Sequence, residues 1–124
     1  MTEETRDATP LGEIFASRRY FRPPDAGGEY IAEVAIGRPV VSPVANEEFI
    51  CPFRIQIKDQ EIIRLARGVD EMHALLMALA YVEGAMEVLR DNLEGQICYL
   101  GGQVGELGLQ LPNIKAIAES DTSG

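Results

Sequence analysis

The sequence predicts an α+β fold, in which an antiparallel sheet of about four strands forms a meander and one long helix packs on one face. Residues 49–58 alternate strictly between two sets of side chains, which is the two-residue period of a β-strand. Beyond residue 70, apolar residues recur every three or four positions, as in an amphipathic helix. The turns between the expected strands are short, which favours antiparallel neighbours, because parallel strands need long crossovers.

The first two strands are expected at Glu13–Phe21 and Glu29–Arg38. They are separated by two prolines and the turn-forming segment Asp25–Gly28. A proline-containing loop over residues 39–47 follows and is long enough to be a binding loop.

The third strand, Phe49–Lys58, is the clearest element of the sequence. It contains Pro52, which has no amide hydrogen and is therefore expected at a sheet edge or at a bulge. A turn at residues 58–61 leads to a fourth strand at Ile62–Arg67.

Asp70 is a suitable N-cap for a helix from Glu71 to about Asn92. Such a helix is about 33 Å long, enough to cross a whole sheet face. The side chains expected in the core are Val34, Ile36, Phe49, Phe53, Ile55, Ile57, Leu65, Met72, Leu75, Leu79, Val82 and Met86.

Two short elements are expected near the C-terminus: a strand at Ile97–Leu100 and a final helix from Pro112 to Ala118. Polar composition marks residues 1–10 and 118–124 as flexible arms. A single α+β domain is therefore expected over residues 11–117.

The chain has a net charge of −9, which argues against nucleic acid or an anionic membrane as a partner, because both require clustered Lys and Arg. No continuous apolar run approaches the ~18 residues of a membrane span. The first ten residues lack the basic and apolar regions of a signal peptide, so we expect a cytoplasmic protein.

The residues available for chemistry are few. Cys51 and Cys98 form no C-x-x-C motif and are expected to be free thiols, and the only histidine, His73, lacks metal-ligand spacing. Cys51 falls on the core face of its strand, where burial makes a thiol unreactive. The glycine-rich stretch 101–108 follows a helix, whereas a phosphate-binding loop follows a strand. No catalytic residue, metal or cofactor is therefore expected.

Several short segments resemble a family of small bacterial domains of unknown function. That family has no established activity, so the resemblance implies one compact domain and nothing chemical; glutamine is expected where His73 stands. The segments are Ile14–Arg19, Ile36–Pro39, Cys51–Ile55, Gly68–Asp70, His73–Leu75, Leu100–Gly102 and Leu107–Pro112.

Two functions remain open. The first, which we favour, is a non-enzymatic protein-interaction module of the regulatory or immunity type, which neutralises a basic protein partner through its acidic helix. The second is a small-molecule-binding protein or hydrolase with a site between loop 39–47 and the glycine-rich stretch 101–108. No catalytic dyad or phosphate loop supports the second.

A homodimer is also expected, through the open sheet face or the C-terminal leucines at 107, 109 and 111. The open face is predicted to present Ile50, Pro52, Arg54, Gln56 and Lys58 of the third strand and Ile62, Arg64 and Ala66 of the fourth. The residues predicted for an interaction surface are Arg54, Arg64, Glu83, Glu87, Asp91 and Leu109.

Overall fold

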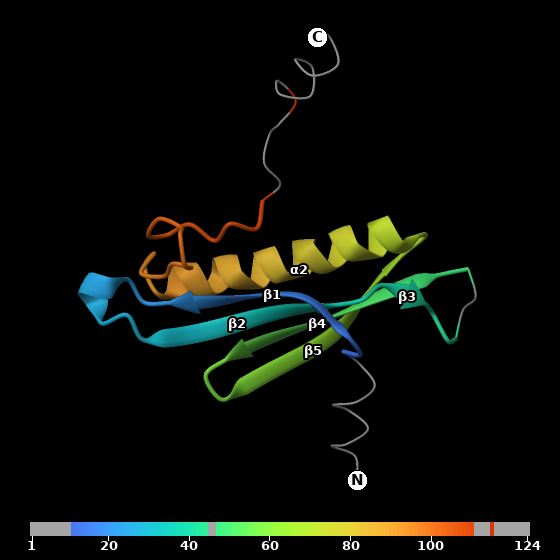
Figure 1. Cartoon of the computed structure of the whole chain (residues 1–124), viewed down its shortest axis with the longest axis horizontal. Helices are drawn as coiled ribbons and strands as arrows, with labels where there is room; N and C mark the ends of the chain where they lie inside the picture. The colour runs from blue at the N-terminus through green and yellow to red at the C-terminus, as the bar shows by residue number, and fades with distance from the viewer. Residues whose placement is uncertain (1–10, 45–46, 111–114, 116–124) are drawn as a thin grey trace.

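A computed structural model describes residues 11–44, 47–110 and 115, and shows an open antiparallel sheet with one long helix packed against it (Figure 1). The predicted α+β fold is confirmed. A short 3-10 turn, η1 (Pro24–Ala26), joins the first two strands. The strands are β1 (Ile14–Phe21), β2 (Tyr30–Gly37), β3 (Val40–Val41), β4 (Phe49–Ile57) and β5 (Gln60–Gly68), and the helix is α2 (Glu71–Asn92).

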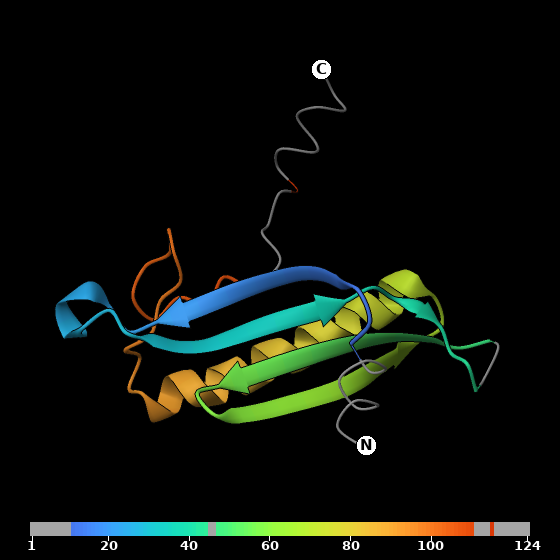
Figure 2. The ribbon, with the colours of Figure 1, turned by 60° about the horizontal axis from the view of Figure 1, so that its bottom comes forward.

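The sheet has five strands where about four were predicted. The additional strand, β3, lies inside the predicted loop 39–47 and pairs with the start of β4, with Val40 opposite Ile50. Because β2 and β3 pair with the same edge of β4, the sheet is still a meander that runs from β1 through β2 and β4 to β5 (Figure 2).

The sheet has a bulge between β2 and β3. Ile36 lies opposite Phe53 and Val40 opposite Ile50, so the three residues 37–39 face only Cys51 and Pro52. A proline fits beside such a break, because proline has no amide hydrogen and the sheet makes no ladder hydrogen bond at this point. Pro52 thus occupies a bulge, as predicted.

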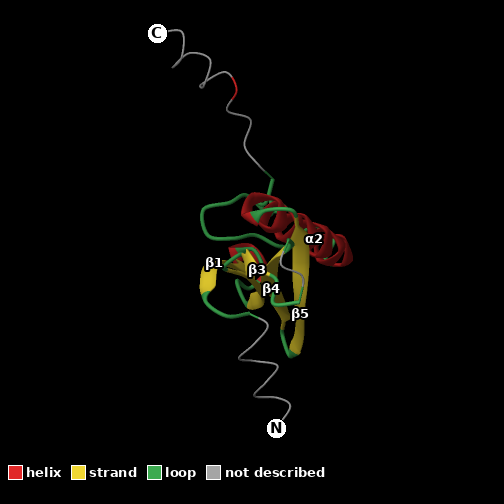
Figure 3. Cartoon of the chain, turned by 90° about the vertical axis from the view of Figure 1, so that its right-hand side faces the viewer, coloured by secondary structure: helices red, strands yellow, loops and turns green. Residues whose placement is uncertain are grey.

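Helix α2 has the predicted start and end. It begins at Asp70, whose carboxylate accepts a hydrogen bond from the His73 amide (2.7 Å). Its inner face is made of small and medium side chains, which let it lie close to β4 and β5 (Figure 3). The fully buried residues of α2 are Ala74, Ala78, Val82 and Met86.

The segment 97–110 covers the part of the sheet that α2 leaves open, over β1 and β2. Cys98 and Phe21 exchange two backbone hydrogen bonds (2.8 and 2.9 Å), and Ile97 and Leu107 are buried in the core. The predicted strand at 97–100 is reduced to this single bridge. The predicted helix from Pro112 to Ala118 lies outside the described residues, except for Lys115, which is helical.

Two residues predicted in the core are exposed: Leu65 (40%) and Met72 (64%). Ile62 of β5 lies opposite Ile55, a core residue of β4, so Ile62, Arg64 and Ala66 face the helix side of the sheet. The predicted outward facing of these three residues was therefore wrong by one position. Leu65 points to the open face instead, and Met72 lies on an exposed side of α2, whereas Ala74 is on its buried side.

Helix α2 is long and apolar enough to cross a membrane by length and composition, although the sequence contains no continuous apolar run of that length. This property reflects apolar residues both on the buried side of the helix and outside it. One side is buried against the sheet, and exposed apolar residues such as Leu76, Tyr81 and Val88 lie on its other sides.

Met86, which is buried, and Met72, which is exposed, test the packing of α2. Met86→Ala is expected to lower the free energy of unfolding by about 2–5 kcal/mol, because it leaves a cavity in the core. Met72→Ala, the same substitution at an exposed site of the same helix, is expected to change it by less than ~0.5 kcal/mol. Urea unfolding followed by circular dichroism measures both. Equal effects would mean that the facing of α2 is wrong.

Candidate functional site

Two side chains of β1 hold the segment 97–110 in place. The Arg18 guanidinium donates hydrogen bonds to the carbonyl oxygens of Gly108 (2.6 Å) and Leu107 (3.3 Å), and lies 4.3 Å from the ring centroid of Tyr99. The buried Tyr20 hydroxyl donates to the same Leu107 carbonyl (2.8 Å). Burial raises the pKa of Tyr20, an effect that the nearby Arg18 charge only partly opposes. We call these four side-chain contacts the β1 clamp.

The backbone of Gly108 lies directly against this clamp and leaves no room for a side chain. Its φ is +67°, in the left-handed region that favours glycine. A Cβ atom there would also collide with the ring of Tyr99 and with the Arg18 guanidinium. Close packing against Tyr99 and Arg18 therefore explains the glycine at position 108.

The clamped segment and α2 enclose a groove of about 660 Å³, here called the acidic groove. Glu83 and Glu87, one helical turn apart and both half-buried, line it beside Tyr99 and Leu109. Within the described ranges neither carboxylate forms an ion pair. Arg90 also lines the groove, but its guanidinium donates to the carbonyl of Gly105 (3.2 Å). The groove thus presents two half-buried carboxylates beside apolar surface.

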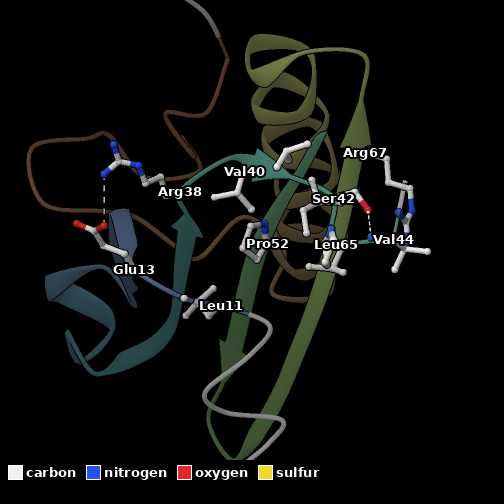
Figure 4. Close-up of a pocket in the computed structure, with 13 residues that line it drawn as sticks. Leu11, Glu13, Arg38, Val40, Ser42, Val44, Pro52, Leu65 and Arg67 are labelled. Atoms are coloured by element: carbon white, nitrogen blue, oxygen red, sulfur yellow. Dashed lines mark hydrogen bonds and ion pairs between the residues drawn. The ribbon is translucent and has the colours of Figure 1, made fainter. Parts of the chain in front are cut away.

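A second cavity, the open-face hollow, lies on the other side of the sheet and has a volume of about 530 Å³ (Figure 4). Its charged rim residues are paired within the chain: Arg38 with Glu13 (3.4 Å) and Arg67 with Glu48 (3.2 Å). Its floor is apolar, and is built from Leu11, Val40, Val41, Val44, Ile50, Pro52 and Leu65.

The six residues predicted for an interaction surface do not share one surface. Glu83, Glu87 and Leu109 come together in the acidic groove, and Asp91 is exposed on α2 outside it. The two arginines lie on the sheet and are separate from this site.

Arg54 lies on the open face and pairs with Glu33 (3.4 Å), which also pairs with Arg19 of β1 (3.3 Å). Its buried Nε has no hydrogen-bond partner within the described part of the chain. Arg64 lies on the helix side of β5 and donates to the Ile63 carbonyl (3.0 Å).

Loop 39–47 and the glycine-rich stretch, between which a small-molecule site was predicted, contribute to different cavities. Residues 40–44 line the open-face hollow, and residues 105–108 line the acidic groove. Neither cavity combines the two segments.

Cys51 and His73 have structural roles in the described part of the chain. Cys51 is buried, as predicted; its thiol donates to the Gly37 carbonyl (3.4 Å), and burial raises its pKa to about 11. His73 accepts a hydrogen bond from the Val69 amide at Nδ1 (3.0 Å), beside the helix cap. Over residues 11–44, 47–110 and 115, no three His, Cys, Asp or Glu side chains are placed to hold a metal ion.

The sequence reasoning missed Arg18, Tyr20 and Tyr99, which shape the acidic groove. The signal available was that Arg18 and Tyr20 share one face of the first strand. Their partners, however, lie more than 80 residues away in the chain. No local pattern reveals such pairs.

A family model described as a domain of unknown function, DUF6968, matches residues 17–111. The match includes Arg18 and Tyr20 of the β1 clamp, helix α2 and the clamped segment 97–110. No curated protein and no solved structure matches the chain.

The raised pKa of Cys51 predicts its reactivity. In a Cys98→Ser variant, a thiol reagent at pH 8 should label Cys51 only after unfolding in urea; rapid labelling of the native protein would contradict its burial.

The contribution of Cys51 to the free energy of unfolding depends on pH, with a defined sign. The unfolded thiol ionises from pH 9.0 and the native one only from about pH 11, so the contribution of Cys51 to stability is complete below pH 9.0 and decreases between these values.

Proposed function

We propose that this chain, which belongs to the DUF6968 family of domains of unknown function, is a non-enzymatic protein-interaction domain of the regulatory or immunity type. The observation that supports this function is that Glu83 and Glu87 line the acidic groove and form no ion pair with any described residue. The expected partner is a basic protein that inserts a Lys or Arg side chain between α2 and the clamped segment.

The chemistry of the groove suits such a side chain. A cation near both carboxylates interacts more strongly in a half-buried groove than on an open surface, because the effective dielectric constant is lower. The aliphatic part of a Lys or Arg side chain can pack on Leu109 and Tyr99, while its charged end reaches the carboxylates. The net charge of −9 would also accelerate encounter with a basic protein.

The groove walls are held in place before any partner binds. Glu83 and Glu87 project from a helix whose inner face is fully buried, and the opposite wall is held by Arg18 and Tyr20. A preformed site loses less conformational entropy on binding than a mobile one. This supports recognition by the groove as it stands.

The open-face hollow favours a second candidate function, the binding of a small apolar molecule. Its volume of about 530 Å³ is within the range of small-molecule sites. The arginines at its rim already pair with Glu13 and Glu48, and Cys51 is not among its lining residues. These observations favour binding of a small apolar molecule over its hydrolysis.

We propose in addition that the domain is a cytoplasmic homodimer. Of the C-terminal leucines expected to contribute to it, Leu107 is buried and Leu109 is half-buried against the core, whereas residue 111 lies outside the described residues. This favours a dimer surface on the sheet over one built from Leu107 and Leu109.

Two charge-matched double variants test the acidic groove. Glu83→Gln with Glu87→Gln removes the two carboxylates that α2 contributes to the groove, and we expect at least a tenfold loss in the amount of basic protein captured from a lysate of the native host. Asp91→Asn with Glu94→Gln removes the same charge from exposed positions outside the groove and should retain capture. Quantitative mass spectrometry of the captured proteins measures both. Equal losses would indicate bulk charge alone, and no loss in either variant would contradict the proposed site.

A further inference from the structure

We propose that a second copy of this chain pairs with the outer edge of β5, so that the two sheets become continuous across a two-fold axis at Leu65. This proposal rests on the homodimer proposed above and concerns the surface that forms it. The acidic groove lies on the opposite flank of α2, so both copies would keep it open.

The two edges of the sheet differ in how they are protected. Strand β5 pairs with β4 over all nine residues without a register shift, and no described strand covers its other side. Strand β1, the other edge, has two register irregularities, and its end is bonded to Cys98. Bulges and covered ends block edge pairing, whereas a long regular edge is a template for another strand. The outer side of β5 is therefore the available edge.

The backbone of β5 offers hydrogen-bonding groups at alternate residues. The two-residue turn after Ile57 makes Ile57 and Gln60 a hydrogen-bonded pair, and such pairs alternate along an antiparallel ladder. Ile63 and Leu65 therefore direct their amides and carbonyls away from β4. The Ile63 carbonyl accepts a hydrogen bond from the side chain of its neighbour Arg64 (3.0 Å), a bond that an incoming strand can replace.

Apolar side chains flank this edge on both faces of the sheet. On the open face, Leu65 is 40% exposed. On the other face, Leu79 and Glu83 mark the flank of α2 that meets Leu109, so residues on the opposite flank lie toward β5. That flank carries Tyr81, which stacks on Phe53 and is 58% exposed, together with Met77 and Val88. Their burial would add the area that edge pairing alone cannot supply.

Charge selects the register of the pairing. Overlap of all nine residues would place Arg64 opposite Arg64 of the second copy, and directly opposed like charges destabilise a sheet. A shift that puts Leu65 on the two-fold axis places Arg64 opposite Ala66 and Ile63 opposite Arg67. This register opposes no like charges and keeps both helices on the same side of the sheet.

Sedimentation equilibrium of two edge variants tests the surface. The wild-type protein at tens of micromolar should have the mass of two 13.6 kDa chains. Leu65→Lys should be a monomer, because a charge at the two-fold axis opposes its own copy. Phe15→Lys, which changes an exposed residue of the β1 edge, should remain a dimer. A monomeric wild type would overturn both the homodimer and this proposal.

Single cysteines on β5 test the register in a Cys98→Ser background. Leu65→Cys should form an intermolecular disulfide under mild oxidation, because residues paired across the axis have Cα atoms about 5.5 Å apart. Ile63→Cys should not, because its copy is displaced by four residues, or about 13 Å along the strand. Preferential linkage through Arg64→Cys or Ile63→Cys would overturn the proposed register. A dimer in which none of the three links would overturn the β5 surface and leave the homodimer itself standing.

Discussion

The width of the sheet is the constraint on which the rest of this structure depends. Four strands abreast span about 14 Å between the outer two, and their side chains extend further, whereas a helix with its side chains is about 10–12 Å across. Helix α2 lies over β4 and β5 and cannot also cover β1 and β2. The segment 97–110 covers them instead, without regular secondary structure, and so its backbone carbonyls need other donors. Arg18 and Tyr20 supply them.

The acidic groove follows from this division of the sheet between two covering elements. It is the seam where α2 and the clamped segment meet, and its shape depends on both. The carboxylates come from the helix, whose bounds are specified locally. The opposite wall depends on β1, at the other end of the chain. A substitution at Arg18 would thus alter the groove without touching either glutamate.

Most of the fold could be predicted because its signals are local. The N-cap at Asp70 and the period of three to four residues determined α2, and strict alternation determined β4. The facing of β5 could not be predicted, because Ile62–Arg67 has apolar residues in both alternating sets. Strand β3 was hidden by the prolines at 39 and 43, which suggested only a loop.

The candidate site was predictable only in part, because local signals place its helix residues but not the segment that packs beside them. Spacing alone places Glu83, Glu87 and Asp91 on one face of a helix. Which of them becomes half-buried depends on what packs beside that face, and here the neighbour is Leu109. Arg54 and Arg64 were predicted together on the open sheet face, but they lie on opposite faces of the sheet.

The hydrogen bonds from Arg18 to Leu107 and Gly108 join residues about 90 positions apart, so they close nearly the longest loop that this domain contains. Contacts of such sequence separation bear the largest loop-closure entropy and are made slowly. During synthesis the residues that close the acidic groove leave the ribosome after the two glutamates. A chain that has been translated, or truncated, to a point before residue 107 therefore has its two glutamates but lacks the opposite wall of the groove.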